Sequence, residues 1–299
     1  MTDLNEFSFT EMWSPLFVLG MVTLLGGYFY LIGPWREKHM PGEARPTLLK
    51  NTYVVSAVIM FYLAQGGPLQ LLGHLNFAFH MVNMSLSYLI VPPVLLLGVP
   101  AFVWRLAFRS PHWRKLGWIM HPMLTLVLFN ILFSIYHMPI VFDFLMANVV
   151  LHRVYYAVLF VTSCMMWWQI VSPVPDWRRM ADVRKMGYIF ANGLLLTPAC
   201  ALIIFASAPL YAAYDPVSLT AAAGSGVSGE HNHLLDQSHA QAAFTLFNPL
   251  EDQQLGGIIM KLVQEIMYGA ILTYVFTQWY RREHRADDEL PPTAEPAGN

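Results

Sequence analysis

Residues 266–285 read IMYGAILTYVFTQWYRREHR. This apolar run ends at Trp279 and Tyr280 and passes directly into Arg281 and Arg282. Aromatic residues beside a basic cluster are typical of the cytoplasmic end of a membrane-spanning helix, because the rings lie among lipid headgroups and the positive charges stay on the cytoplasmic side. The stretch therefore predicts a transmembrane helix whose C-terminal end faces the cytoplasm.

The basic residues of the whole chain are grouped rather than scattered. Hydrophobic residues make up 56% of the chain and charged residues 12%, which is about half the charge of an average soluble domain. A chain that crosses a bilayer repeatedly keeps its Lys and Arg on the cytoplasmic side. The net charge of −2 gives no reason to expect a nucleic-acid partner. Of the 17 Lys and Arg residues, all except Arg153 and Lys261 fall in four clusters: Arg36, Lys38, Arg45 and Lys50; Arg105, Arg109, Arg114 and Lys115; Arg178, Arg179, Arg184 and Lys185; Arg281, Arg282 and Arg285.

Seven apolar runs are long enough to cross a bilayer, which takes about 20 residues. The basic clusters follow the first, third, fifth and seventh runs. The connections after the second, fourth and sixth runs, which we call the even-numbered connections, contain no Lys or Arg. We therefore predict an all-α polytopic membrane protein, a seven-helix bundle with its N-terminus outside and its C-terminus in the cytoplasm. The predicted spans are 14–33, 48–65, 74–97, 116–138, 147–171, 186–208 and 257–280, within one membrane domain (1–282) that has a long outer loop at 209–256.

Both ends of the chain fit this topology. The N-terminal segment carries Asp3, Glu6 and Glu11 and no Lys or Arg, whereas a cleavable signal peptide begins with basic residues. We therefore expect the first apolar run to be a span. The C-terminal tail, residues 283–299, is charged and rich in proline, and is predicted to be disordered.

Histidine and methionine side chains gather near the outer ends of the predicted spans. Ionisable groups inside a membrane cost free energy and usually mark a functional site. His80 and His152 lie at a similar depth in the third and fifth spans, and imidazole together with thioether suits the soft cuprous ion. The outer-half histidines are His74, His80, His137, His152, His231, His233 and His239. The candidate copper ligands are His80, Met84, His137 and His152, with Met81 and Met138 as secondary donors.

Each candidate also has a purely structural interpretation. Met81 and Met84 lie within the third span, where methionine side chains commonly pack in the interior of a helix bundle. Lys261 and Glu265, four residues apart on one face of the seventh span, either tune the site or form an ion pair that fixes helix packing.

Three other functions remain open on the residues alone, and one of them is that of a purely structural partner protein with no bound ligand. A membrane haem protein would use His80 and His152 as axial ligands of haem b. A copper or proton transporter would need polar residues that continue to the inner face, where Asn130, His121 and Asn192 are sparse candidates.

Several longer motifs point to a family. The stretches are YLAQGGPL at 62–69, FHMVNM at 79–84, VPPVLLLGVP at 91–100, HMP at 137–139 and EDQQLGGIIM at 251–260. In these the chain resembles the bacterial CtaG family of multi-span cytochrome c oxidase assembly factors, over about residues 15–280.

The resemblance implies a non-enzymatic protein of the bacterial cytoplasmic membrane that handles copper at its outer side for a haem-copper oxidase. Its partner would be an oxidase subunit or another assembly factor. Asp252 and Gln253 are expected to shape the entry to the seventh span. The chain departs from the family pattern at Met84 and Tyr156, where the pattern has a second histidine four residues after His80 and after His152.

We predict that a reporter enzyme fused after Ser228 lies outside the cytoplasm and that one fused after Ala286 lies inside it, because no Lys or Arg occurs in the even-numbered connections. Alkaline phosphatase activity in intact cells measures the location of each fusion. A cytoplasmic location for the Ser228 fusion would contradict the predicted topology.

Overall fold

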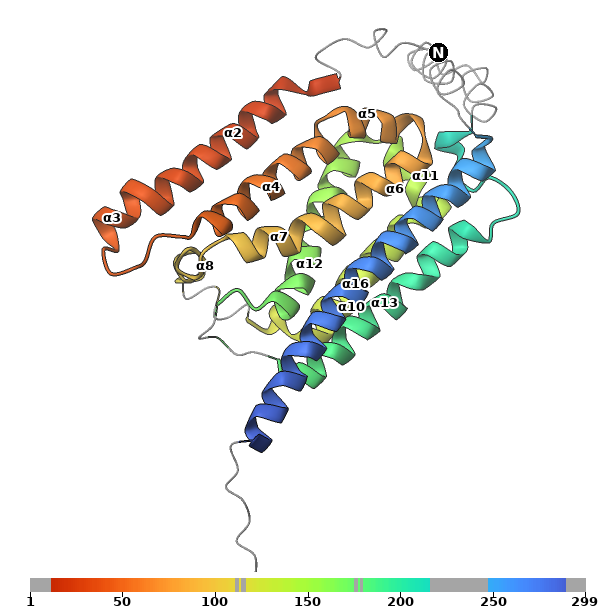
Figure 1. Cartoon of the computed structure of the whole chain (residues 1–299). Helices are drawn as coiled ribbons and strands as arrows, with labels where there is room; N and C mark the ends of the chain where they lie inside the picture. Colours follow the sequence, from red (N-terminus) through yellow and green to blue (C-terminus); the bar gives the residue numbers. More distant parts are fainter. Residues whose placement is uncertain are drawn as a thin grey trace, which may run out of the picture.

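The computed structural model describes residues 12–110, 113, 117–174, 177, 180–215 and 247–288, and these contain helices and no strand. The elements run side by side as one bundle (Figure 1). In chain order they are α2 (Pro15–Tyr30), η2 (Leu31–Trp35), α3 (Arg36–His39), α4 (Leu48–Gln65), α5 (Pro68–Leu75), α6 (Phe77–Ser85), η3 (Leu86–Ile90), α7 (Val91–Gly98), α8 (Ala101–Ala107), η4 (Gly117–Met120), α10 (Pro122–Tyr136), α11 (Pro139–Met146), α12 (Val149–Val171), α13 (Asp182–Ile204), η5 (Ala212–Tyr214) and α16 (Pro249–Asp288).

Within these described ranges, six helical segments are long and apolar enough to cross a membrane. A seventh candidate is the pair α10 and α11, which is bent by 76° and passes the same test when the two helices are taken together. The prediction of an all-α polytopic membrane protein is therefore confirmed. The six segments are Pro15–His39, Leu48–Leu75, Phe77–Gly98, Val149–Val171, Asp182–Ile204 and Pro249–His284.

The third predicted span is divided near its start. Residue 74 belongs to α5, and α6 begins at Phe77 after an extended Asn76. The break is stabilised by α16, a helix far away in the sequence. The Asp252 carboxylate accepts hydrogen bonds from the backbone N–H of Phe77 (2.6 Å) and of Ala78 (3.4 Å). A carboxylate at the first turn of a helix satisfies free N–H groups and interacts favourably with the helix dipole. His74 and His80 consequently lie on different helices.

The last helix begins at Pro249 rather than at residue 257, so it includes Asp252 and Gln253. Asn248 and Glu251 form a reciprocal cap: the Asn248 side chain accepts from the N–H of Glu251 (2.9 Å), and the Glu251 carboxylate accepts from the N–H of Asn248 (3.4 Å). Such a cap starts a helix at this point.

The DQQLGG run at 252–257 joins α16 to two other helices. The Gln253 side chain accepts from the N–H of Leu210 (2.7 Å). A Cβ atom added to Gly256 would lie 2.9 Å from the Phe77 ring on α6, and one added to Gly257 would lie 2.9 Å from the Ile203 side chain on α13. Only glycine allows α16 to approach both helices this closely.

The two prolines of the third span change its hydrogen bonding. Pro92 has no N–H to offer the carbonyl of Tyr88, and the turn before it, Leu86–Ile90, is a π-helix. The Tyr88 carbonyl instead accepts from the Ser163 hydroxyl (2.6 Å) and from the Trp167 indole (3.1 Å), both on α12. The prolines therefore tie the third span to the fifth.

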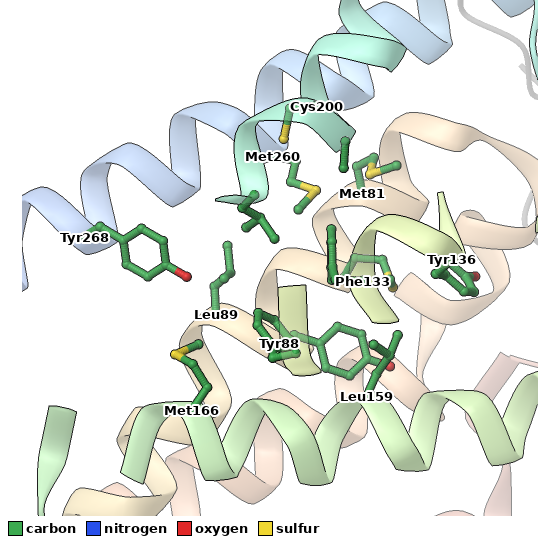
Figure 2. Packing of buried hydrophobic residues seen from close by; sticks show 14 of the residues in the cluster. Met81, Tyr88, Leu89, Phe133, Tyr136, Leu159, Met166, Cys200, Met260 and Tyr268 are labelled. Carbon is green, nitrogen blue, oxygen red and sulfur yellow. The ribbon is translucent and has the colours of Figure 1, made fainter. Parts of the chain in front are cut away.

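The apolar core lies among these helices. Figure 2 shows Met81 and Tyr88 from the third span, Phe133 from α10, Met166 from α12 and Met260 from α16 converging on a common interior. In contrast, α2 lies at the periphery beside α4 (Figure 1), and Tyr28 is its one buried residue.

The two ends of the bundle differ in their polar residues. At the end that carries α3 and α8, Arg105 pairs with Glu43 (3.1 Å), and the buried Arg36 donates to the carbonyl of Ile32 (2.9 Å). We call this the basic end. At the opposite end, with α5 and α11 (Figure 1), lie His74, His80 and His152; we call it the histidine end.

We predict that Gly98→Ala lowers the free energy of unfolding by about 1–3 kcal/mol. A Cβ at Gly98 would lie 2.8 Å from the backbone nitrogen of Val54 and 2.9 Å from the Lys50 carbonyl, and backbone atoms of α4 cannot move aside easily. The matched control is Gly27→Ala, where no atom lies within 4 Å of the added Cβ. Thermal unfolding of the detergent-solubilised protein measures both, and equal midpoints would contradict the close α4–α7 contact.

Candidate functional site

The hydroxyl of Tyr136 is the meeting point of three helices at the histidine end. Tyr136 is the last residue of α10 and is fully buried. Its oxygen lies 2.9 Å from Nε2 of His152, 3.4 Å from Nε2 of His80 and 3.1 Å from the hydroxyl of Tyr156. A phenol has one proton to donate and two lone pairs. Tyr136 therefore donates to one of these groups and accepts from others, which makes the cluster one hydrogen-bonded unit.

Aromatic side chains enclose His80 on its other sides. Its ring centre lies 5.3 Å from that of Phe142, 5.7 Å from that of Phe77 and 6.2 Å from that of Tyr214. His80 is only 3% exposed. The imidazole therefore lies among aromatic rings, and its Nε2 contacts the Tyr136 hydroxyl.

The segment that follows α13 covers this pocket. The Tyr214 hydroxyl donates to the carbonyl of Gly73 (2.5 Å), and the Tyr211 hydroxyl donates to the carbonyl of His137 (2.9 Å). The Asp143 carboxylate accepts from the N–H groups of Ala212 (3.2 Å) and Ala213 (3.1 Å). Burial raises the pKa of Tyr211 and of Tyr214, so both hydroxyls remain protonated donors.

His152 is the more accessible imidazole of the pair. It lies one turn into α12, where Asn148 caps the helix, and it is 8% exposed. Its ring centre is 4.2 Å from that of Tyr156 and 6.3 Å from that of His74, whose ring meets it edge-on. His74 is partly exposed at the end of α5.

Met84 and Met81 lie in the core of the bundle. Met84 is one turn beyond His80 on α6 and is fully buried. Met81 is also fully buried, and its Cγ lies 3.0 Å from the position that a Cβ on Gly256 would occupy. The hydrogen bonds of the Tyr136 hydroxyl bring His80 and His152 together and involve neither methionine.

His137 and Met138 lie at the bend between α10 and α11. The His137 ring is fully buried, its Nδ1 lies 2.8 Å from the Phe133 carbonyl, and its Nε2 has no hydrogen-bond partner within the part of the chain that the structure describes. Met138 is 49% exposed. His231, His233 and His239 fall outside the described residues.

The charged pair of the seventh span contacts α13. The Lys261 ammonium lies 2.5 Å from the Glu265 carboxylate and donates to the Thr197 hydroxyl at 2.8 Å. The Glu265 side chain is 62% exposed. These contacts join α16 to α13 rather than to the helices that carry His80 and His152.

A model of the family described as cytochrome c oxidase caa3 assembly factor matches residues 26–282, which is most of the chain.

The chain belongs to this family.

The resemblance to the CtaG family is thereby confirmed, and with it the assembly of cytochrome c oxidase as the general function. Comparisons with curated proteins and with solved structures gave no match. The matched range includes every described residue of the candidate site in this caa3 assembly factor, from Gly73 to Glu265.

Sequence reasoning missed Tyr136 as the centre of the site. Tyr136 directly precedes His137, and successive residues of a helix point about 100° apart, so the two side chains face different neighbours. The sequence does not show which of the two turns toward His80. Tyr156, in contrast, was visible from its spacing, since it follows His152 by four residues and occupies the same face of α12.

We predict that Tyr136→Phe lowers the free energy of unfolding of this assembly factor by about 1–3 kcal/mol, because it leaves buried hydrogen-bonding groups of His80, His152 and Tyr156 without their partner. The control is Tyr274→Phe, which removes a hydroxyl from a residue that is 63% exposed. Thermal unfolding in detergent compares the two. If both variants unfold like the parent protein, the Tyr136 hydroxyl does not hold the three helices together.

Proposed function

We propose that this caa3 assembly factor handles copper for the oxidase at the outer face of the bacterial cytoplasmic membrane, with His80 and His152 as the ligands of the transferred ion. The observation that supports this is the convergence of two imidazole Nε2 atoms, from α6 and α12, on the single Tyr136 hydroxyl. Two buried imidazoles aimed at one point are a donor arrangement that suits copper.

The donor set favours transient binding. Within the described ranges, no group of three or more His, Cys, Asp or Glu side chains is placed to hold a metal ion. A site with two imidazoles and two flanking phenols, Tyr136 and Tyr156, binds an ion more weakly than a complete cage of four protein ligands. Weak, reversible binding is what a delivery protein requires, because the ion must leave for the oxidase. We regard copper as cargo and expect no catalytic step in this protein.

In the topology predicted from the sequence, this site lies toward the outer side of the membrane, where we propose that copper is transferred. If the basic end faces the cytoplasm, the histidine end faces outward. An outward-facing site could exchange copper with a subunit of cytochrome c oxidase or with another assembly factor, the partners that we propose.

Haem b fits the geometry less well. Axial ligation by His80 and His152 would require a porphyrin plane between the two imidazoles. The Tyr136 hydroxyl lies within hydrogen-bonding distance of both Nε2 atoms, so a porphyrin would have to displace the whole Tyr136 side chain, whereas a single ion would replace only the hydrogen bonds of the hydroxyl.

A polar seam toward the basic end is better explained as helix packing than as a transport path. The Asn130 amide donates to Asn192 (2.6 Å), and the Asn192 amide donates to the Tyr268 hydroxyl (2.8 Å) and to the sulfur of Met166 (2.9 Å). Hydrogen bonds of this kind join neighbouring helices in membranes.

We predict that His80→Ala and His152→Ala each abolish oxidase maturation while leaving the abundance of the assembly factor near normal. The reason is that each variant removes one of the two imidazoles that meet at Tyr136. His284→Ala, an exposed position at the basic end, is the control and should retain full maturation. Cytochrome c oxidase activity in membranes and immunoblotting of the assembly factor give the two measurements. Parallel loss of protein and activity would show that the histidines serve folding.

A further inference from the structure

His74 lies beside His152 and is the histidine whose ring contacts the His152 ring within the part of the chain that the structure describes. The two ring centres are 6.3 Å apart, and the rings meet edge-on. His74 is partly exposed, His152 is 8% exposed and His80 is 3% exposed. Three imidazoles from α5, α12 and α6 therefore form a row in which exposure decreases from the surface of the histidine end toward the interior.

The other approaches to His80 are occupied by aromatic rings. Phe77, Phe142 and Tyr214 pack around it, and Tyr136 stacks on it with ring centres 5.9 Å apart. The segment that carries Tyr214 is fastened by the hydrogen bonds to Gly73, His137 and Asp143 described above. An ion that moves from His152 to His80 would displace the Tyr136 hydroxyl, which lies within hydrogen-bonding distance of both Nε2 atoms.

Packing fixes the position of His74 relative to this row. A Cβ added to the neighbouring Gly73 would lie 3.3 Å from Cα of His80, so α5 packs closely on the first turn of α6. The carbonyl of Gly73 is also the acceptor for the Tyr214 hydroxyl. His74 is thus held on the same rigid unit as the pocket that contains His80.

We propose that His74 is the entry ligand of the copper site: it takes cuprous ion at the surface and passes it to His152, from which it reaches His80. The proposal rests on the function proposed above. The step is a ligand exchange in which the bond from copper to the His74 nitrogen breaks as the bond to the His152 nitrogen forms. Neutral imidazole replaces neutral imidazole, so copper keeps its oxidation state and no proton is taken up or released.

An entry ligand has a kinetic signature that distinguishes it from a member of the final site. It lowers the barrier that uptake and release share, so its loss slows both processes by the same factor and leaves the equilibrium unchanged. Loss of a final ligand weakens retention instead.

The test uses the full-length protein in detergent and cuprous ion supplied as the bicinchoninate complex, whose loss of colour reports uptake. We expect His74→Ala to slow uptake, and to slow release to excess chelator, on the order of tenfold, which corresponds to about 1.4 kcal/mol in the barrier that the two processes share. Copper per protein at equilibrium should stay at the parent value. His74→Met, which keeps a soft cuprous ligand at the same place, should restore the rate. His80→Ala should instead lower copper per protein, and His284→Ala should change neither quantity.

The outcomes are separable. Uptake by His74→Ala at the parent rate overturns the entry role, and so does a loss of equilibrium copper as large as that of His80→Ala, which would make His74 part of the final site. A parent protein that retains no copper would refute the proposed function itself, and the entry role with it. Size-exclusion elution of each variant at the parent volume shows that folding is intact.

Discussion

The carboxylate of Asp252 is the contact on which the geometry of the histidine end depends. It lies in the first turn of α16 and caps the first turn of α6, through the N–H groups of Phe77 and Ala78. In a membrane interior, free backbone N–H groups cost several kcal/mol each, so a helix that starts at depth needs such an acceptor. The cap allows the chain to end α5 at Leu75 and begin a new helix at once. His74 and His80 owe their relative placement to this break.

The glycines that follow Asp252 make the cap possible. Gly256 and Gly257 let α16 lie against α6 and α13 at distances that any side chain would prevent. Gln253 and Gln254 then bind the chain just after α13, at the N–H of Leu210 and the carbonyl of Ala206. The same short run therefore positions α6 from one side and the aromatic cover of His80 from the other.

The pocket itself combines two environments. Aromatic rings exclude water around His80, while the Tyr136 hydroxyl satisfies the imidazoles that would otherwise be buried without partners. An unpaired polar group there would cost free energy, and a fully paired one holds three helices in register. In the copper transfer that we propose, an arriving ion would compete with the hydrogen bonds of one phenol, which is a modest barrier compared with the dismantling of a folded cage.

The basic end is stabilised separately. Arg36 is buried through hydrogen bonds to the carbonyls of Ile32 and Glu43, and Arg105 pairs with the Glu43 carboxylate. The residues predicted to face the cytoplasm thus fasten the connections between spans, far along the bundle from the histidines.

The sequence by itself determined the class of the protein. Inside a bilayer, an apolar run of about 20 residues can pair all its own backbone N–H and C=O groups only as a helix, so the all-α fold follows from the length and order of these runs and their basic flanks. EDQQLGGIIM and the other motifs pointed to the family that the chain belongs to. The positions of His80 and His152 within their predicted spans also indicated a similar depth for the two residues. Only the tertiary structure decided which neighbours share the site. The rotation of α10 turns Tyr136 toward the histidines, α5 brings His74 beside His152, and α13 receives Lys261. Helix phase and the contacts between helices distant in sequence result from packing, which no local pattern of residues encodes.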